Sequence, residues 1–194
     1  MRVGIMGGTF DPVHLGHLIA AECAREGADL DEVWFMPCNA PPHKKDAPGA
    51  TSRQRWDMVC LAVRDHPAFR PVDLEIRRGG VSYSYDTVQM LKERHPDVHF
   101  SYIIGADMVQ YLPHWHRIDE LAQLISFIGL KRPGTDIRWG ELAETIRSRI
   151  TMVDMPLLDI SSTAIRERRR SGKSVRFLVP EEVRKYMEVA GLYE

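Results

Sequence analysis

The chain begins with a short apolar segment, a pair of glycines and the start of a helix. Residues 2–6 are largely apolar and run into Gly7 and Gly8, a pattern typical of a buried strand that enters a turn. From Leu15 onward apolar residues recur at helical spacing, so we expect a helix to begin near Val13. Glycines let a backbone approach an anion, and a helix start offers free N–H groups. This beginning therefore predicts an α/β fold with an anion site at its first turn.

The rest of the chain alternates between strand-like and helix-like segments. Strands are expected at 32–37, 72–76, 100–105, 125–130 and 150–153, and helices at 51–64, 84–95, 118–124, 162–170 and 180–189. Such alternation is typical of a parallel sheet covered by helices. We predict a single domain over residues 1–194, an α/β doubly wound Rossmann-like parallel sheet with a small helical C-terminal lobe. Ligands of such sheets bind beyond the carboxyl ends of the strands.

Composition restricts where the protein works and what it binds. The formal net charge is -1, so no global basic field points to nucleic acid. The three cysteines, Cys23, Cys38 and Cys60, are scattered without a CxxC pair, which is typical of reduced thiols in a cytosolic protein. No signal-peptide pattern is seen, and no stretch approaches the roughly 18 to 20 apolar residues of a membrane span. We expect a cytoplasmic protein without nucleic-acid or membrane partners.

Two histidines mark the first turn of the expected helix. His14 and His17 are three residues apart, so both side chains lie on one side of that turn and can donate hydrogen bonds to phosphate oxygens. Metal binding is the weaker alternative because no acidic or cysteine partner accompanies them and HExxH is absent. The remaining alternative is that the two histidines have a purely structural role. Asp11 is expected to cap the helix or to orient a histidine. The dinucleotide fingerprint GxGxxG is absent, which disfavours a hydride-transfer enzyme.

Residues 160–166, Ile-Ser-Ser-Thr-Ala-Ile-Arg, form a second candidate anion site. Ser162 and Thr163 place hydroxyls and free N–H groups at a helix start, and Arg166 follows one turn later. An ordinary helix cap is the alternative. Lys44 lies in a loop rich in proline and glycine and can reach a phosphate as a point charge, unless the loop is merely solvated.

These residues resemble the signature of a known family. Gly8-x-Phe10-Asp11-Pro12 followed by His14-x-Gly16-His17 looks like the motif of the HxGH nucleotidyltransferases. The similarity continues over nearly the whole chain, and its further motifs are those of bacterial nicotinate-nucleotide adenylyltransferases. These motifs are PPHK at 41–44, SYxYDT at 82–87, GxD with LxxW at 105–115, and ISSTxIR at 160–166.

The resemblance implies an enzyme of NAD biosynthesis that transfers AMP from ATP to nicotinate mononucleotide. It implies direct in-line attack without a covalent intermediate, release of pyrophosphate, and Mg²⁺ carried in with ATP rather than a metal held by the protein. His14, His17 and Arg166 are the implied catalytic residues. The positions implied at ATP are Gly8, Thr9, Phe10, His14, His17, Gly105, Asp107, Arg132, Ser162, Thr163 and Arg166. Those implied at the nicotinate nucleotide are Lys44, Ser84, Thr87 and Trp115, with the Trp115 indole stacked on the pyridine ring.

Two positions depart from the family pattern, and three other functions are weighed. Ser84 replaces an expected threonine and His116 an expected tyrosine, so the role of His116 stays open. The alternatives are a sister transferase that uses phosphopantetheine or another phosphate ester, a nucleotide-binding regulator without turnover, and a class I tRNA-synthetase fragment. The last is disfavoured by chain length and by the lack of a KMSKS-like loop. The preference for nicotinate over nicotinamide mononucleotide, metal preference, loop closure and oligomeric state, with a homodimer among the alternatives, stay open.

Overall fold

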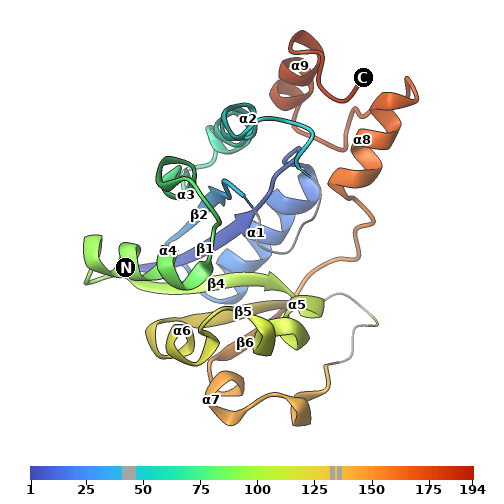
Figure 1. Ribbon diagram of the computed structural model, residues 1–194. Helices are drawn as coiled ribbons and strands as arrows, with labels where there is room; N and C mark the ends of the chain where they lie inside the picture. Colours follow the sequence, from blue (N-terminus) through green and yellow to red (C-terminus); the bar gives the residue numbers. More distant parts are fainter. Residues whose placement is uncertain (41–46, 132–133, 135–136) are drawn as a thin grey trace.

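One parallel sheet of six strands organises the protein (Figure 1). The computed structural model describes residues 1–40, 47–131, 134 and 137–194. The strands are β1 (Arg2–Gly8), β2 (Glu32–Pro37), β3 (Phe69–Pro71), β4 (His99–Gly105), β5 (Ser126–Lys131) and β6 (Ile150–Asp154). They pair in the order β3-β2-β1-β4-β5-β6, all parallel. This order confirms the predicted doubly wound, Rossmann-like α/β sheet.

Helices cover both faces of the sheet. One face packs against α1 (Leu15–Gly27) and α2 (Ser52–Val63), and the C-terminal helices α8 (Ser162–Arg170) and α9 (Glu181–Val189) extend the same apolar cluster. The other face carries α3 (Leu74–Arg78), α4 (Ser84–Arg94), α5 (Ala106–Tyr111), α6 (Ile118–Leu124) and α7 (Glu144–Arg147). In the described part of the chain, the 3₁₀ helix η1 (Leu112–His114) follows α5, and the 3₁₀ helix η2 (Trp139–Glu141) precedes α7.

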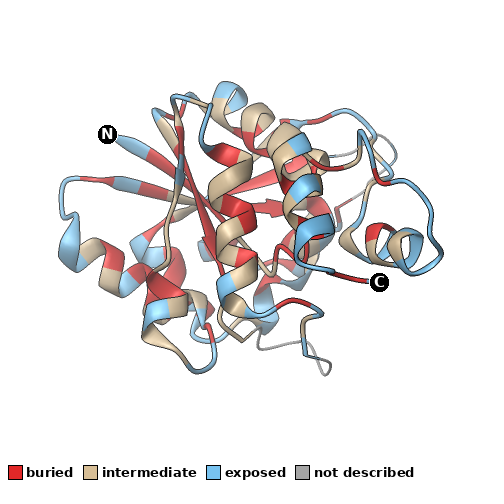
Figure 2. Ribbon diagram, turned by 90° about the horizontal axis from the view of Figure 1, so that it is seen from above, coloured by how far each residue is buried: buried red, intermediate tan, exposed pale blue. Residues whose placement is uncertain are grey.

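The sheet separates two apolar clusters because side chains alternate along each strand. In β1, Val3 and Ile5 belong to the cluster under α4 and α6, whereas Met6 belongs to the cluster under α1. Figure 2 shows that buried residues run along the strands and the inward sides of the helices. The strand residues are therefore apolar on both faces, as expected of a parallel sheet.

The predicted C-terminal lobe is formed by α8 and α9, which lie together at one end of the molecule near α2 (Figure 1). The lobe is tied to the turn of residues 9–14 that joins β1 to α1, here called the β1–α1 turn. The Ser162 hydroxyl donates to the Pro12 carbonyl over 2.9 Å, and the Leu15 amide donates to the Leu178 carbonyl over 2.9 Å. The lobe is therefore in contact with the turn that carries His14 and with the start of the helix that carries His17.

One predicted strand is wrong. Residues 72–76 were expected to alternate between two faces of a sheet, but the strand lies earlier, at Phe69–Pro71, and Leu74–Arg78 is helix α3. Leu74 and Glu75 are both buried, and adjacent residues of a strand would point to opposite faces. The first helix begins at Leu15 with His14 as its N-cap, two residues after the expected start. The short helices α5 and α7 were not predicted.

The structure also bears on the expected state of the cysteines and on membrane-spanning helices. Cys23, Cys38 and Cys60 are free cysteines. Across the described part of the chain, none of the helices combines the length and the apolar character that crossing a membrane requires.

Candidate active site

A pocket of about 540 Å³ opens where β1 and β4 end. Gly8 and Thr9, at the end of β1, line one side, and Gly105, the last residue of β4, lines another. The chain leaves β1 toward β2 and leaves β4 toward β5, so the pocket lies at the point where the strand order reverses. Open α/β sheets bind their ligands at this point.

Close contact between β1 and β4 shapes the floor of the pocket. A Cβ atom on Gly7 would overlap the hydroxyl oxygen of Tyr102 and lie 3.0 Å from its Cζ, so only glycine fits there. Tyr102 is buried in β4, and its ring also lines the pocket. The absent side chain at Gly7 therefore makes room for an aromatic ring.

His14 and His17 lie together at the start of α1. Their rings stack with centroids 3.6 Å apart and an angle of 23° between planes, and both line the pocket. The His14 amide donates to Nδ1 of His17 over 3.2 Å. Because Nδ1 accepts this bond, the neutral His17 ring carries its proton on Nε2. His17 is thus arranged as a hydrogen-bond donor through Nε2.

The residues just before the histidines support them. The Thr9 carbonyl accepts a hydrogen bond of 2.7 Å from Nη1 of Arg55, a side chain that is 1% exposed. Phe10 has a positive φ of 50°, and its buried ring meets the His17 ring edge-on, 5.0 Å between centroids. Phe10 does not line the pocket but lies behind His17. Its place at ATP stays a prediction.

The end of β4 places two further predicted residues side by side. Gly105 lines the pocket and is the N-cap of α5, and Asp107 is exposed in the first turn of that helix. The Asp107 carboxylate folds back over Gly105, since a Cβ added there would lie 2.5 Å from Oδ1.

Trp115 forms an aromatic wall of the pocket. Its indole is half-buried and meets Tyr102 edge-to-face, with centroids 5.4 Å apart and an angle of 87°. Phe127 makes a second contact of this kind at 6.4 Å. Two edge-to-face contacts fix the plane of the indole. His116 also lines the pocket, and its ring lies 4.5 Å from that of Tyr83.

The structure separates the two predicted residues of α4. Ser84, the first residue of the helix, lines the pocket, whereas Thr87 is fully buried and does not. The Thr87 hydroxyl donates to Oε1 of Glu75 over 2.7 Å. Glu75 is 3% exposed and does line the pocket. Glu75 was not among the predicted site residues, because residues 72–76 were expected to form a strand.

Burial makes Glu75 a weaker acid than an exposed glutamate. Loss of hydration raises the pKa of the Glu75 carboxyl, although hydrogen bonds from Thr87 and Ser82 and the nearby charge of Arg78 act in the opposite direction. A buried acid at the wall of a pocket is a group that can affect which ligand charges are accepted there.

The start of α8 lies against the β1–α1 turn. Nη1 of Arg166 donates to the Asp11 carbonyl over 2.8 Å, and Nη2 donates to the Thr163 hydroxyl over 3.4 Å. Ser162, Thr163 and Arg166 do not line the pocket, but Ile160 just before them does. The structure thus brings both predicted anion sites to one edge of the sheet.

Of the two roles expected for Asp11, capping α1 is wrong because the N-cap is His14, and orienting a histidine stays a prediction. The Asp11 carboxylate instead accepts hydrogen bonds from the amides of Gly49 and Ala50 and from the hydroxyl of Tyr193. Tyr193 is 182 positions away in the sequence, so no local pattern could have indicated this contact.

Two predicted residues, Lys44 and Arg132, lie outside the described residues. Among the residues that the structure does describe, no three His, Cys, Asp or Glu side chains come together as a metal site.

The doubly wound sheet, the glycine turn and the paired histidines at a helix start define a nucleotidyltransferase-like protein. Residues 5–168 match the model of the cytidylyltransferase-like family. The chain is 46% identical over 193 residues to the nicotinate-nucleotide adenylyltransferase of Bacillus subtilis, covering 100% of this chain and 98% of the relative. It is 48% identical over 192 residues to a protein of Geobacillus kaustophilus named "Probable nicotinate-nucleotide adenylyltransferase", covering 99% and 86%. The chain therefore belongs to the nicotinate-nucleotide adenylyltransferase family and is an enzyme, which confirms the resemblance drawn from its motifs.

A solved structure shows the same fold at lower sequence similarity. The nicotinic acid mononucleotide adenylyltransferase of Plasmodium falciparum, complexed with NaAD, superposes with a TM-score of 0.81 at 20% identity. The match covers 99% of this chain and 97% of the other. The arrangement of strands and helices is thus shared over the whole length.

Proposed function

We propose that the protein transfers AMP from ATP to nicotinate mononucleotide and forms nicotinate adenine dinucleotide (deamido-NAD) and pyrophosphate, a step of NAD biosynthesis. One observation carries the proposal: a single pocket has stacked His14 and His17 on one wall and the oriented indole of Trp115 on another. Relatives that share nearly half of the sequence over its full length carry the name of this activity.

The histidine wall suits the triphosphate of ATP. Gly8 and Thr9 offer backbone at close range, and the start of α1 adds its positive dipole end. In this proposal His17 donates through Nε2, since its Nδ1 accepts from the His14 amide. In this proposal Ser162, Thr163 and Arg166 hold phosphate oxygens from the start of α8. Mg²⁺ enters with ATP as part of that substrate, and no step is assigned to a metal held by the protein.

The Trp115 wall suits the acceptor. A flat indole whose plane is fixed by Tyr102 and Phe127 can stack on a pyridine ring. Ser84 and His116 line the pocket beside it and offer polar groups to the nucleotide. Thr87 contributes through Glu75 rather than by contact of its buried side chain.

The proposed chemistry is direct in-line transfer. An oxygen of the acceptor's 5′-phosphate attacks the α-phosphorus of ATP, the bond to the β-phosphate oxygen breaks, and pyrophosphate leaves. Transfer of this kind depends on positioning and on neutralising charge more than on covalent chemistry. Donors fixed before the reaction, such as Nε2 of His17, stabilise the charge that develops on the α-phosphate.

The test measures pyrophosphate release from Mg-ATP with three acceptors in parallel: nicotinate mononucleotide, nicotinamide mononucleotide and phosphopantetheine. We expect strong release with the first. Equal release with nicotinamide mononucleotide would keep the proposed reaction and widen the acceptor specificity. Release with phosphopantetheine alone would refute nicotinate mononucleotide as the acceptor. Changing His17 to Ala should lower turnover about 10²- to 10³-fold. His99 is exposed at the opposite end of β4, so His99→Ala is the matched control and should keep wild-type turnover.

Several expectations stay predictions. They are the single domain over residues 1–194, the cytoplasmic location, the lack of nucleic-acid and membrane partners, and the homodimer left open above. Sedimentation of the purified protein would decide the oligomeric state.

A further inference from the structure

The Asp11 carboxylate lies at the centre of a buried cluster. It is 4% exposed and accepts hydrogen bonds from the Gly49 amide at 2.8 Å, the Ala50 amide at 3.0 Å and the Tyr193 hydroxyl at 2.6 Å. Nη1 of Arg166 lies 3.7 Å from the same carboxylate. Three segments that are far apart in sequence thus converge on one side chain of the β1–α1 turn.

Asp11 also determines where Arg166 lies. The Arg166 guanidinium donates to the Asp11 carbonyl over 2.8 Å and faces its carboxylate, so backbone and side chain of one residue hold it. The Arg166 side chain is 21% exposed and still reaches solvent. A change in the position of Asp11 is therefore passed on to the arginine proposed to hold phosphate, and along the turn to His14.

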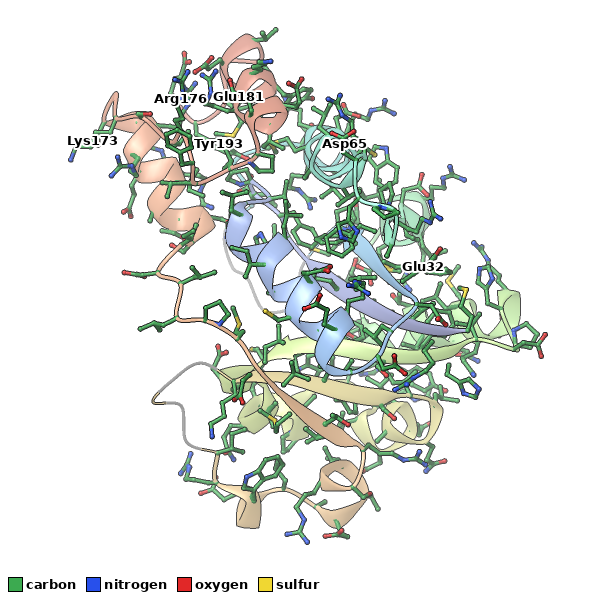
Figure 3. All side chains as sticks on the ribbon, turned by 180° about the vertical axis from the view of Figure 1, so that it is seen from behind. Glu32, Asp65, Lys173, Arg176, Glu181 and Tyr193 are labelled. Carbon is green, nitrogen blue, oxygen red and sulfur yellow. The ribbon has the colours of Figure 1, made fainter. Side chains whose placement is uncertain are left out.

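Tyr193 follows α9 and lies beside the C-terminal helices (Figure 3). Its ring is buried against Gly49, where an added Cβ would lie 3.1 Å from Cε1. Arg169 of α8 fixes the neighbouring residues, through the Leu192 carbonyl at 3.4 Å and the Glu194 carboxylate at 2.7 Å. Burial, together with the bond to Asp11, raises the pKa of the Tyr193 hydroxyl, which therefore stays protonated at neutral pH.

We propose that Tyr193 is a positioning residue for nucleotidyl transfer, whose hydroxyl fixes the Asp11 carboxylate and through it Arg166. The proposal rests on the proposed function for the reaction that it affects. Displacement of a reacting group by a fraction of an ångström to 1 Å can cost up to about 100-fold in rate, so a residue that never touches substrate can control turnover.

The chain offers a matched control for the loss of the Tyr193 hydroxyl. Tyr186 of α9 donates to Oδ2 of Asp57 over 3.2 Å, also between the C-terminal lobe and the rest of the protein. Tyr193→Phe and Tyr186→Phe therefore remove the same kind of bond from the same lobe. Only the first removes it from the β1–α1 turn.

The first measurement compares steady-state kinetics of the two variants. We expect Tyr193→Phe to lower kcat about 10-fold, the loss of one hydrogen bond to a charged group, with KM for nicotinate mononucleotide within about twofold of wild type. Tyr186→Phe should keep kcat within about twofold. Equal losses in both variants, or wild-type kcat in Tyr193→Phe, would overturn the proposal.

A second pair of variants tests whether the effect passes through Arg166. In an Arg166→Lys background the guanidinium fork is gone, so adding Tyr193→Phe should lower kcat by less than about twofold. A full 10-fold further loss would show that Tyr193 acts independently of Arg166 and would refute the proposed route.

Amide hydrogen exchange separates this proposal from the proposed function. Exchange at Gly49 and Ala50 should be faster in Tyr193→Phe than in Tyr186→Phe, because a displaced carboxylate no longer holds these two amides. This comparison needs no substrate. If the wild-type protein lacked transfer to nicotinate mononucleotide, the proposed function would fail, whereas unchanged exchange would refute the positioning role of Tyr193.

Discussion

Replacing Gly7 with alanine should damage the pocket from within the sheet. The new Cβ would overlap the Tyr102 hydroxyl and lie 3.0 Å and 3.3 Å from the ring atoms Cζ and Cε1. Tyr102 is buried and contacts Trp115, so its ring can move only by disturbing the aromatic wall. Alanine at this position should therefore lower both stability and acceptor binding.

Both effects can be given a magnitude. Overpacking of a buried site costs about 1–3 kcal/mol. In a protein of this length each kcal/mol lowers Tm by about 2–4 °C, so Gly7→Ala should melt about 2–12 °C below wild type. An edge-to-face aromatic pair is worth about 0.5–1.5 kcal/mol, so its loss should raise KM for nicotinate mononucleotide by about 2- to 12-fold.

The assay is a thermal melt combined with acceptor kinetics, with one control and one rescue. Gly140 has no atom within 4 Å of an added Cβ, so Gly140→Ala should melt within about 2 °C of wild type. Adding Tyr102→Phe to Gly7→Ala removes the overlapping oxygen and should recover part of the lost Tm. A Gly7→Ala protein with the Tm and KM of the Gly140→Ala control would refute the reasoning.

Three further outcomes follow from buried groups near the pocket. Arg55 is 1% exposed and donates to two backbone carbonyls, so Arg55→Met should lower the free energy of unfolding, measured in urea, by about 2–5 kcal/mol. The side chain of Arg53 on the same helix is 80% exposed, so Arg53→Met should change this free energy by less than about 1 kcal/mol. Burial raises the pKa of Glu75 above its ordinary value of 4.5, so the folded state holds this proton more tightly than the unfolded chain and stability falls as pH rises from about 4.5 through the raised pKa. Urea unfolding at a series of pH values should therefore show a smaller loss for Glu75→Gln, and a loss equal to that of wild type would contradict the assignment. Trp115→Ala should raise KM for nicotinate mononucleotide about 10-fold and leave KM for ATP unchanged, whereas half-buried Trp139→Ala should change neither; equal effects on both substrates would argue against stacking.

The sequence predicts the parts of this fold that are encoded locally. Segments of two or more helical turns, such as Ile118–Leu124 and Ser162–Arg170, have the bounds that were expected. Five residues are too few to show a helical period, so alternation at residues 72–76 favoured a strand where α3 forms. Glu75 is buried where the Thr87 hydroxyl of α4 donates to it, and this contact is made only in the folded chain.

The candidate site shows the same limit. The glycines at the end of β1 and the histidines at the start of α1 could be placed from their spacing, since a strand end and a helix start fix their geometry. The partners of Asp11 could not be predicted from the sequence, because Gly49, Arg166 and Tyr193 reach Asp11 from separate parts of the chain. Phe10 matches the family motif, yet its ring lies behind His17, and a motif does not show which way a side chain points.

The reversal of strand order between β1 and β4 also has a consequence for folding. Among the described residues, β2, β3 and the helices α1 to α4 separate these neighbours along the chain, and the pocket between them is completed by residues as late as Ile160. Contacts of such long range form slowly and only after most of the chain is in place. A partly folded chain therefore lacks the complete pocket, and a ligand of the pocket binds the native state alone. At a hundred times its Kd such a ligand raises the free energy of unfolding by about 2.7 kcal/mol.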